Sequence, residues 1–478
     1  MTTIALSLVS HTNVGKTTLA RTLLRRDIGE VRDDAHVTQR AEAQLMIASP
    51  EGHRLELWDT PGFGDSVRLA RRLAQAGNPI GWFMSEVWDR LRDRAFWSSQ
   101  HAVRNVFEQA DVVLYLVNAS ESPGDAGYLD AELQVLTLLR KPVVVLLNQL
   151  GPPQPPAVEA AEVQRWRERT GGAACVREVL ALDAFARCWV QEGALLQRIA
   201  PLLPADRQAA FDALARAWAA RSEATWQQAM GVLARRLARA ALDLQPVADA
   251  GWADRLKSVG SSLGLRRADD ATPRQQAERV LAERLAADIR ATTDELIALH
   301  GLGGRAGATV LARLAEHYAA RQPASEGRAA VLGGMLTGAL AGLKADLLTG
   351  GLTMGGGLLA GGVIGALGAA GLARGYNLVR GVEQPTLSWS TTVLEELAHA
   401  ALLGYLAVAH FGRGRGDWAE TEHPAFWTAQ VSAVLDARRD ALHALWQRRS
   451  SGDAFVSELR QWLIDACGDL LARLYPPP

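Results

Sequence analysis

A short run near the N-terminus combines the residue types that bind phosphate. Residues 10–17, "SHTNVGKT", match the phosphate-binding pattern G-x-x-x-x-G-K-[ST], except that Ser10 replaces the first glycine. In such a loop the backbone N–H groups surround the phosphates, the lysine reaches the β- and γ-oxygens, and the last hydroxyl ligates Mg²⁺. We therefore predict that Lys16 binds phosphate and that Thr17 binds magnesium. The nucleotide-binding residues predicted from this loop are Asn13, Val14, Gly15, Lys16, Thr17 and Thr18.

The sequence on either side of this loop has the context that the motif requires. The run "TIALSLVS" predicts a strand before it, and residues 16–26 predict a helix whose N-terminus points at the anion. Ser10 stands at the end of the strand, where glycine is preferred for conformational freedom but a small residue is tolerable. The alternative is a chance match in an ordinary turn between a strand and a helix.

A second motif supplies contacts to the metal and to the γ-phosphate. In "LELWDTPGFGD" an aspartate ends a predicted strand and is followed by a glycine in the D-x-x-G arrangement. We expect Asp59 to hold Mg²⁺ through water and the Gly62 amide to contact the γ-phosphate. Between the two motifs, "DDAHVTQRAE" offers Thr38 as a threonine that closes over Mg²⁺ and the γ-phosphate; its alternative role is that of a plain loop residue.

Several runs together resemble a known family. "HTNVGKTTL" with "WDTPGF" is similar to the Era-like branch of the translation-factor-related GTPases. The set "SHTNVGKTTLAR", "AHVTQRAEAQ", "LWDTPGFGDS", "NPIGWFMSEVWDR", "VLLNQLGPP" and "LALDAFARCWVQE" resembles bacterial GTPase-like proteins with a C-terminal domain of unknown function, DUF3482. The resemblance covers most of the chain. It implies an α/β P-loop GTPase fold with GTP as substrate and Mg²⁺ as cofactor.

The residues around the predicted γ-phosphate site suggest how hydrolysis proceeds. Phe63 follows the D-x-x-G motif, where Ras-type enzymes have a glutamine that orients water. Asn13 stands where potassium-activated relatives use an asparagine to hold K⁺ beside the phosphates, often while two G domains face each other. The resemblance thus implies slow basal hydrolysis that K⁺ or G-domain dimerisation raises. The predicted catalytic residues are Lys16, Thr38, Gly62 and Asn13.

The choice of base is less well defined by the sequence. GTPases read guanine with N-K-x-D after the fifth strand, whereas this chain has "NQLG", with Asn148, Gln149 and, at the aspartate position, Gly151. Losing that carboxylate removes about 1–3 kcal/mol of base discrimination, by analogy with base-edge readout. Asp183 in "LALDAF" is a candidate substitute. The alternatives left open are a GTP site, an ATP or relaxed site, and a site without productive hydrolysis.

Composition excludes some functions and sets expectations for location. The 478 residues include 51 Lys and Arg against 52 Asp and Glu, so we expect no nucleic-acid partner, which would need a basic face. Three widely separated cysteines favour a reducing cytosol over a disulfide framework. The start "MTTIALSLVS" lacks the basic region of a signal peptide. We therefore expect a cytoplasmic protein.

Changes in composition along the chain divide it into two domains. Alternating β-rich and helical runs predict a mostly parallel α/β GTPase domain over 1–200, with a helical insertion at about 66–109. A stiff "GPPQPP" break follows the fifth strand. Ala, Leu, Arg and Glu at helical spacing then predict an all-α, DUF3482-like domain over 201–478, without strands.

A glycine-rich apolar block, 329–374, interrupts the helical domain. Gly334, Gly338 and Gly342 recur at every fourth position, and so do three glycines from Gly357, which predicts a glycine-zipper helical hairpin with closely packed backbones. Residues 347–373 carry no charge and are long enough as helix to span a bilayer. One interpretation is a soluble helix pair; the other is association with a membrane, the inner membrane in a bacterium.

Two functional hypotheses follow from these observations. In the first, the protein is a GTPase switch whose nucleotide state controls a helical effector domain, with an unknown protein partner or a membrane as its target. In the second, nucleotide is a structural ligand of a partner-docking scaffold and hydrolysis is negligible. Phe63 and Gly151 favour the second hypothesis. The first is favoured by the intact motif residues Lys16, Thr17, Thr38 and Asp59.

Overall fold

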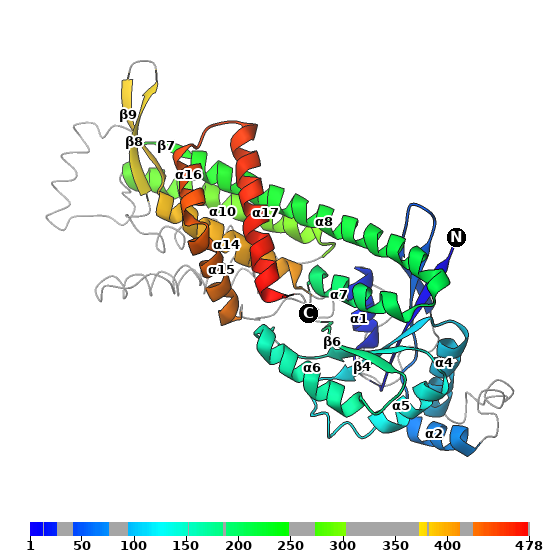
Figure 1. The fold of residues 1–478 in the computed structure, drawn as a ribbon. Helices are drawn as coiled ribbons and strands as arrows, with labels where there is room; N and C mark the ends of the chain where they lie inside the picture. The colour runs from blue at the N-terminus through cyan, green and yellow to red at the C-terminus, as the bar shows by residue number, and fades with distance from the viewer. Residues whose placement is uncertain are drawn as a thin grey trace.

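The structure is a computed structural model that shows a sheet-based domain and a helical region joined by one long helix (Figure 1). It describes residues 1–12, 14–25, 42–75, 94–151, 153–184, 188–247, 273–302, 372–379, 382–411 and 424–476. Asn13, Thr38 and residues 329–371 of the predicted glycine-zipper hairpin lie outside the described residues.

A six-stranded sheet forms the framework of the N-terminal domain. Its strand order is β2-β3-β1-β4-β5-β6, and only the β2–β3 pair is antiparallel. The expected mostly parallel α/β fold is confirmed. The strands are β1 (Thr3–Ser10), β2 (Glu42–Ala48), β3 (Arg54–Asp59), β4 (Val112–Asn118), β5 (Val143–Asn148) and β6 (Val176–Ala181).

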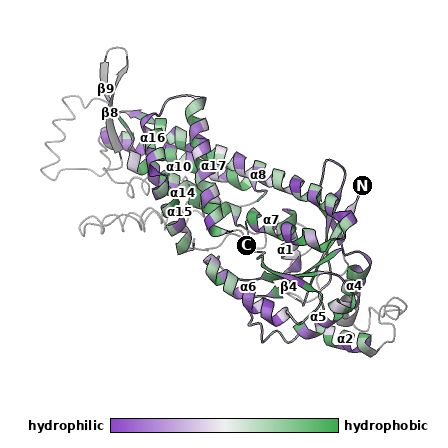
Figure 2. Cartoon of the chain, viewed as in Figure 1, coloured by the Kyte–Doolittle hydropathy of each residue, from purple (hydrophilic) through white to green (hydrophobic). Residues whose placement is uncertain are grey.

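The central strands are hydrophobic because helices cover both faces of the sheet. Strands β4 and β5 are buried along almost their whole length, as continuous apolar runs predict. Figure 2 shows hydrophobic residues concentrated in this sheet. In β4, alternate side chains enter separate cores: Leu114 and Leu116 lie on one face, Tyr115 and Val117 on the other. The sheet therefore separates two hydrophobic layers.

In the described part of the domain, six shorter helices cover the sheet. Helices α1, α7 and the first half of α8 pack on one face, and α2, α4, α5 and α6 pack on the other (Figure 1). The predicted insertion, 66–109, holds α2 and α4 on the second face. The helices are α1 (Lys16–Leu24), α2 (Ser66–Gln75), α4 (Arg94–Glu108), α5 (Leu129–Leu138), α6 (Pro156–Thr170) and α7 (Trp189–Ile199), which the short 3₁₀ turn Ala200–Leu202 follows.

Helix α8 (Ala205–Leu242) connects the two halves of the molecule. It has 38 residues, about 57 Å at the usual helical rise. Phe211, Leu214 and Trp218 in its first half belong to the core beside the sheet. Leu233 and Leu237 in its second half belong to the core of the helical region. One continuous helix thus contributes side chains to both cores.

The helical region packs around a hydrophobic central helix, α14. In α14 the N-cap Ser390 accepts a hydrogen bond from the Val393 N–H, which fixes the start of the helix. Among the described residues, α14 alone is long and apolar enough to cross a membrane by composition, and 78% of its most apolar window is buried inside the protein. The helices are α10 (Pro273–Leu299), α14 (Thr391–Ala409), α15 (Ala425–Ala437), α16 (Arg439–Gln447) and α17 (Asp453–Leu474).

A small antiparallel sheet corrects the prediction that 201–478 is all-α. Strands β7 (Leu244–Pro246), β9 (Val382–Trp389) and β8 (Leu372–Val379) pair in the order β7-β9-β8. Pro385 lies in the central strand, where proline normally argues against a strand, but it falls just beyond the three residues that pair with β7. The predicted end of the glycine-rich hairpin is also wrong, because 372–374 begin β8. The region is mostly helical.

Candidate functional site

The phosphate-loop residues connect the end of β1 to the start of α1. Gly15 has φ +90°, a left-handed conformation that favours glycine, and its carbonyl accepts the Leu19 N–H at 3.0 Å. A Cβ at Gly15 would lie 2.9 Å from Asn148 Nδ2. Val14 and Thr18 are both buried. The loop is therefore fixed by Asn148, the last residue of β5, as well as by helix α1.

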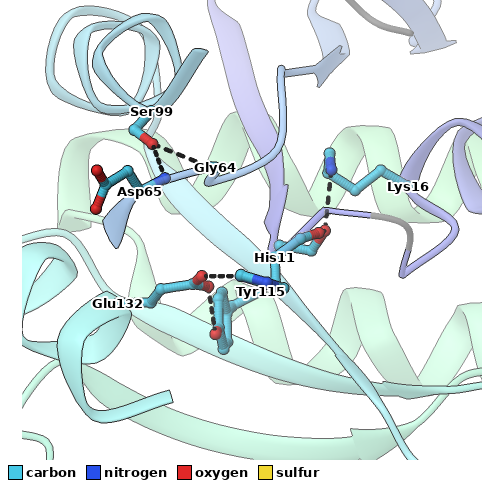
Figure 3. A network of polar contacts seen from close by, with 8 residues as sticks. His11, Lys16, Gly64, Asp65, Ser99, Tyr115 and Glu132 are labelled. Atoms are coloured by element: carbon cyan, nitrogen blue, oxygen red, sulfur yellow. Dashed lines mark hydrogen bonds and ion pairs between the residues drawn. The ribbon is translucent and has the colours of Figure 1, made fainter. Parts of the chain in front are cut away.

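Lys16 is held inside this loop. Its side chain is 8% exposed, and Nζ donates to Ser10 Oγ at 2.9 Å (Figure 3). Ser10 in turn donates to the carbonyl of His11. Burial lowers the pKa of Lys16, while the carboxylates of Asp59 and Glu132 act to raise it. The residue that replaces the first glycine of the motif thus contacts the phosphate-binding lysine.

Thr17 and Asp59 meet in the arrangement that a magnesium ion requires. Thr17 Oγ1 donates to Asp59 Oδ2 at 2.7 Å. Asp59 is 5% exposed, and its Oδ1 atom has no hydrogen-bond partner in the part of the chain that the structure describes. Burial raises the pKa of Asp59. A buried carboxylate oxygen without a donor, next to a hydroxyl, suits a hard divalent cation, so these two residues fit Mg²⁺.

The D-x-x-G loop pairs with the phosphate loop. The Phe63 N–H donates to the Ser10 carbonyl at 2.9 Å, and His11 and Phe63 form an isolated parallel bridge. A Cβ at Gly62 would lie 3.0 Å from Lys16 Nζ and 3.2 Å from Thr12 Cα. Glycine at this position therefore lets the two loops approach closely.

Phe63 points away from the phosphate side. Its side chain is fully buried in the core that also contains Val9 and Tyr115. Beyond it, the N–H groups of Gly64 and Asp65 donate to Ser99 Oγ at 3.0 and 3.1 Å (Figure 3). A phenyl ring packed in the core cannot orient water, which agrees with the chemistry inferred from the sequence.

The base-reading loop is built around Asn148. Its Nδ2 donates to the Val14 carbonyl and its Oδ1 accepts the Ala184 N–H, both at 2.7 Å. Gln149 and Gly151 both have positive φ, +62° and +82°. Asp183 Oδ2 accepts the Leu150 N–H at 2.6 Å. The carboxylate of Asp183 therefore lies beside the loop position where Gly151 replaces the usual aspartate.

Two polar residues of this site were not found from the sequence. Ser99 lies on α4 and Glu132 on α5, and neither belongs to a motif. Their roles depend on how α4 and α5 pack beside the loops, which spacing along the chain does not reveal. The sequence has no signal that singles out Glu132, because Asp130 in the same helix is also acidic.

Comparisons with known families match the two parts of the chain separately. A family model described as a 50S ribosome-binding GTPase matches residues 5–149. The model of the domain of unknown function DUF3482 matches residues 173–460. The comparison with curated proteins gives no match.

Solved structures of GTPases show limited similarity. A variant of Aquifex aeolicus Era bound to GDP and AlF₄⁻ and an Era bound to MgGDPNP and nucleotides 1506–1542 of 16S ribosomal RNA are each 18% identical, with TM-score 0.31 over 43% of this chain. The chain spans 58% of the length of each Era chain. A bacterial selenocysteine-specific elongation factor is 16% identical over 42% of this chain and 29% of its own, with TM-score 0.26.

The geometry of Gly15 gives a test of the loop. We expect Gly15→Ala to weaken nucleotide binding by at least about tenfold, because a left-handed alanine costs about 1–2 kcal/mol and its Cβ would contact the Asn148 amide at 2.9 Å. Isothermal titration with GDP measures this. Gly172→Ala, with open space around the new methyl group, is the control. Unchanged GDP affinity in Gly15→Ala would show that nucleotide binds elsewhere.

Proposed function

The chain belongs to the DUF3482 family, whose model matches more than half of it, and we propose that it is a GTPase switch whose nucleotide state controls the helical region. Its GTPase domain is expected to bind GTP with Mg²⁺ and to hydrolyse it. The observation that carries this proposal is the meeting of Lys16, Thr17 and Asp59 at one edge of the sheet.

The roles of the residues follow from their positions. Lys16, buried at the start of α1, would bind the β- and γ-phosphates together with the loop amides. Thr17 and Asp59 would hold the metal, which neutralises charge on the phosphates. The Gly62 amide, next to Lys16, would contact the γ-phosphate. These contacts support an electrostatic mechanism in which the protein positions a triphosphate.

Hydrolysis should be slow without stimulation. Phe63 is buried in the core and supplies no group to the attacking water. The sequence supports three further proposals. Asn13 would hold potassium, Thr38 would close over the metal, and two GTPase domains would pair. The alternative function, a nucleotide-bound scaffold for an unknown protein partner, is favoured by buried Phe63 and by Gly151 in the base-reading loop.

Helix α1 offers a route from the phosphates to the helical region. It starts at Lys16, the proposed phosphate-binding residue, and ends eight residues later at Leu24, about 12 Å away. Arg25, directly after it, has φ +54°, donates from Nη2 to Ser222 Oγ on α8 at 3.3 Å, and lies 3.5 Å from the Glu192 carboxylate on α7. A shift of α1 on nucleotide exchange would therefore move a side chain that contacts both α7 and α8.

Arg25 also lines a cavity between the two halves of the molecule. The cavity has a volume of about 40 Å³, and its walls come from α1, α7 and α8 and from the ends of α10 and α14. The Trp189 indole donates to Tyr405 Oη at 3.3 Å across this interface. Burial lowers the pKa of His300, and the charge of Arg25 lowers it further. Because the partly buried Arg25 contacts both α7 and α8, we expect this interface to be sensitive to the position of α1.

Cellular location and further partners are proposals from the sequence alone. We propose a cytoplasmic protein, with membrane association through residues 329–374 as one way for the helical region to act. The near-zero net charge still gives no support to a nucleic-acid partner.

Steady-state phosphate release tests the proposed function. With GTP and Mg²⁺, we expect wild type to turn over and Lys16→Ala to be slower by about 10²–10³-fold, the usual loss when one charge-stabilising donor is removed. Lys141→Ala, on the loop before β5, is the matched lysine control and should behave as wild type. Absence of turnover in wild type, with K⁺ and at high protein concentration, would leave the scaffold function instead.

Base specificity has its own test. The usual guanine-binding aspartate is replaced by Gly151. If Asp183 accepts the N1 and N2 hydrogens of guanine instead, Asp183→Asn should weaken GTP binding by about 10–100-fold. The same variant should strengthen binding of xanthosine triphosphate, because xanthine has a carbonyl where guanine has an amino group. Competition titration with GTP, ATP and xanthosine triphosphate measures both. Glu159→Gln, a nearby carboxylate, is the control. Equal GTP affinities of wild type and Asp183→Asn would refute the assignment.

A further inference from the structure

A buried carboxylate reaches the phosphate loop from the opposite face of the sheet. Glu132 on α5 is fully buried. Its Oε1 atom lies 2.7 Å from His11 Nδ1, and its Oε2 atom accepts a hydrogen bond from Tyr115 Oη, also at 2.7 Å (Figure 3). The His11 ring stacks on Tyr128, with centroids 4.5 Å apart. The imidazole is thus fixed by a hydrogen bond on one edge and by a ring on one face.

This carboxylate occupies a site that would be costly without its partners. Burial raises the pKa of Glu132, whereas the contacts with His11 and Tyr115 and the charge of Lys16 lower it. When Glu132 is ionised it only accepts hydrogen bonds, so His11 Nδ1 would donate to it. The hydrogen bonds with His11 and with the tyrosine hydroxyl offset the desolvation of Glu132. The three side chains form one unit in which each member depends on the others.

The residue that Glu132 holds lies at the junction of the two phosphate-site loops. The backbone of His11 bridges to Phe63, and the preceding carbonyl, of Ser10, accepts the Phe63 N–H. On the other side of His11, the Cα atom of Thr12 lies against Gly62. The turn at 10–12 therefore sets the distance between the phosphate loop and the D-x-x-G loop.

We propose that Glu132 is a positioning residue for the nucleotide reaction: through His11 it fixes the turn at 10–12 against Gly62 in the arrangement that the γ-phosphate requires. The inference rests on the proposed GTPase function. Because the diphosphate is held mainly by the amides of residues 14–18, loss of the Glu132–His11 pair affects the triphosphate state and its hydrolysis more than GDP binding.

The test compares four variants for GTP hydrolysis, for the affinities of GDP and a non-hydrolysable GTP analogue, and for Tm. We expect His11→Ala and Glu132→Ala to lower kcat by about 10–100-fold, the effect of losing one buried hydrogen bond to a charged group. The ratio of analogue affinity to GDP affinity should fall by a similar factor. GDP affinity should stay within about threefold. His11→Asn, whose amide nitrogen takes the place of Nδ1 and can still donate to Glu132, should recover most of the loss, as a positioning role requires. Glu132→Gln, which keeps the shape but not the charge, should be intermediate.

His11→Ala keeps the test decisive even if Glu132→Ala fails to fold. The His11 side chain is 33% exposed, so truncating it leaves no core cavity. His443→Ala is the control, since it removes the imidazole of another histidine–glutamate pair, His443 with Glu395, in the helical region. Wild-type kcat and analogue affinity in His11→Ala would overturn the proposal, and so would a His11→Asn variant as impaired as His11→Ala.

Failure of this inference is distinguishable from failure of the proposed function. If wild type hydrolyses GTP, Lys16→Ala does not, and His11→Ala behaves as wild type, only the positioning role is lost. If wild type does not hydrolyse GTP, the GTPase proposal fails, and the ratio of analogue to GDP affinity still decides the role of Glu132: a lowered ratio supports it and an unchanged ratio refutes it.

Discussion

The burial of Lys16 beside Asp59 is the interaction on which the rest of the site depends. Both residues are almost inaccessible to solvent, and the opposite charges oppose the cost of desolvation. They meet because β1 and β3 are parallel, with Leu8 opposite Asp59, so that the phosphate loop and the D-x-x-G loop leave the same edge of the sheet. Nucleotide and metal would complete this charge pair, which supports the proposed binding of phosphate with a divalent cation.

Two connections lead from this charge pair into the remainder of the protein. On one face of the sheet, Glu132 links α5 to the phosphate loop through His11. On the other face, α1 carries the site to Arg25, which contacts α7 and α8. Helix α8 continues into the core of the helical region, so the GTPase domain and that region share a rigid element. We propose this shared helix as the physical route by which nucleotide state reaches the helical region.

Much of the fold and of the loop chemistry was predictable because it depends on local sequence. Continuous apolar runs indicated β4 and β5, and the G-K-T run placed Lys16 at the start of a helix. The small sheet β7-β9-β8 was missed because β7 has only three residues and β9 contains Pro385, so neither has a strand pattern. The contacts of Ser99 and Glu132 were missed for another reason: they join segments far apart in the chain, and tertiary packing alone brings them together.

Hydrogen exchange with mass spectrometry tests most directly whether nucleotide state reaches the helical region. Amide protection of wild type is compared between the complexes with a non-hydrolysable GTP analogue and with GDP. It should differ in the loop and helix at 14–25 and also at the ends of α10 and α14. These ends lie near His300 and Tyr405, which line the cavity beside Arg25. Helix α16, none of whose residues lines this cavity, should change less. Changed protection at the loop together with identical exchange at the ends of α10 and α14 would contradict the coupling of the two parts.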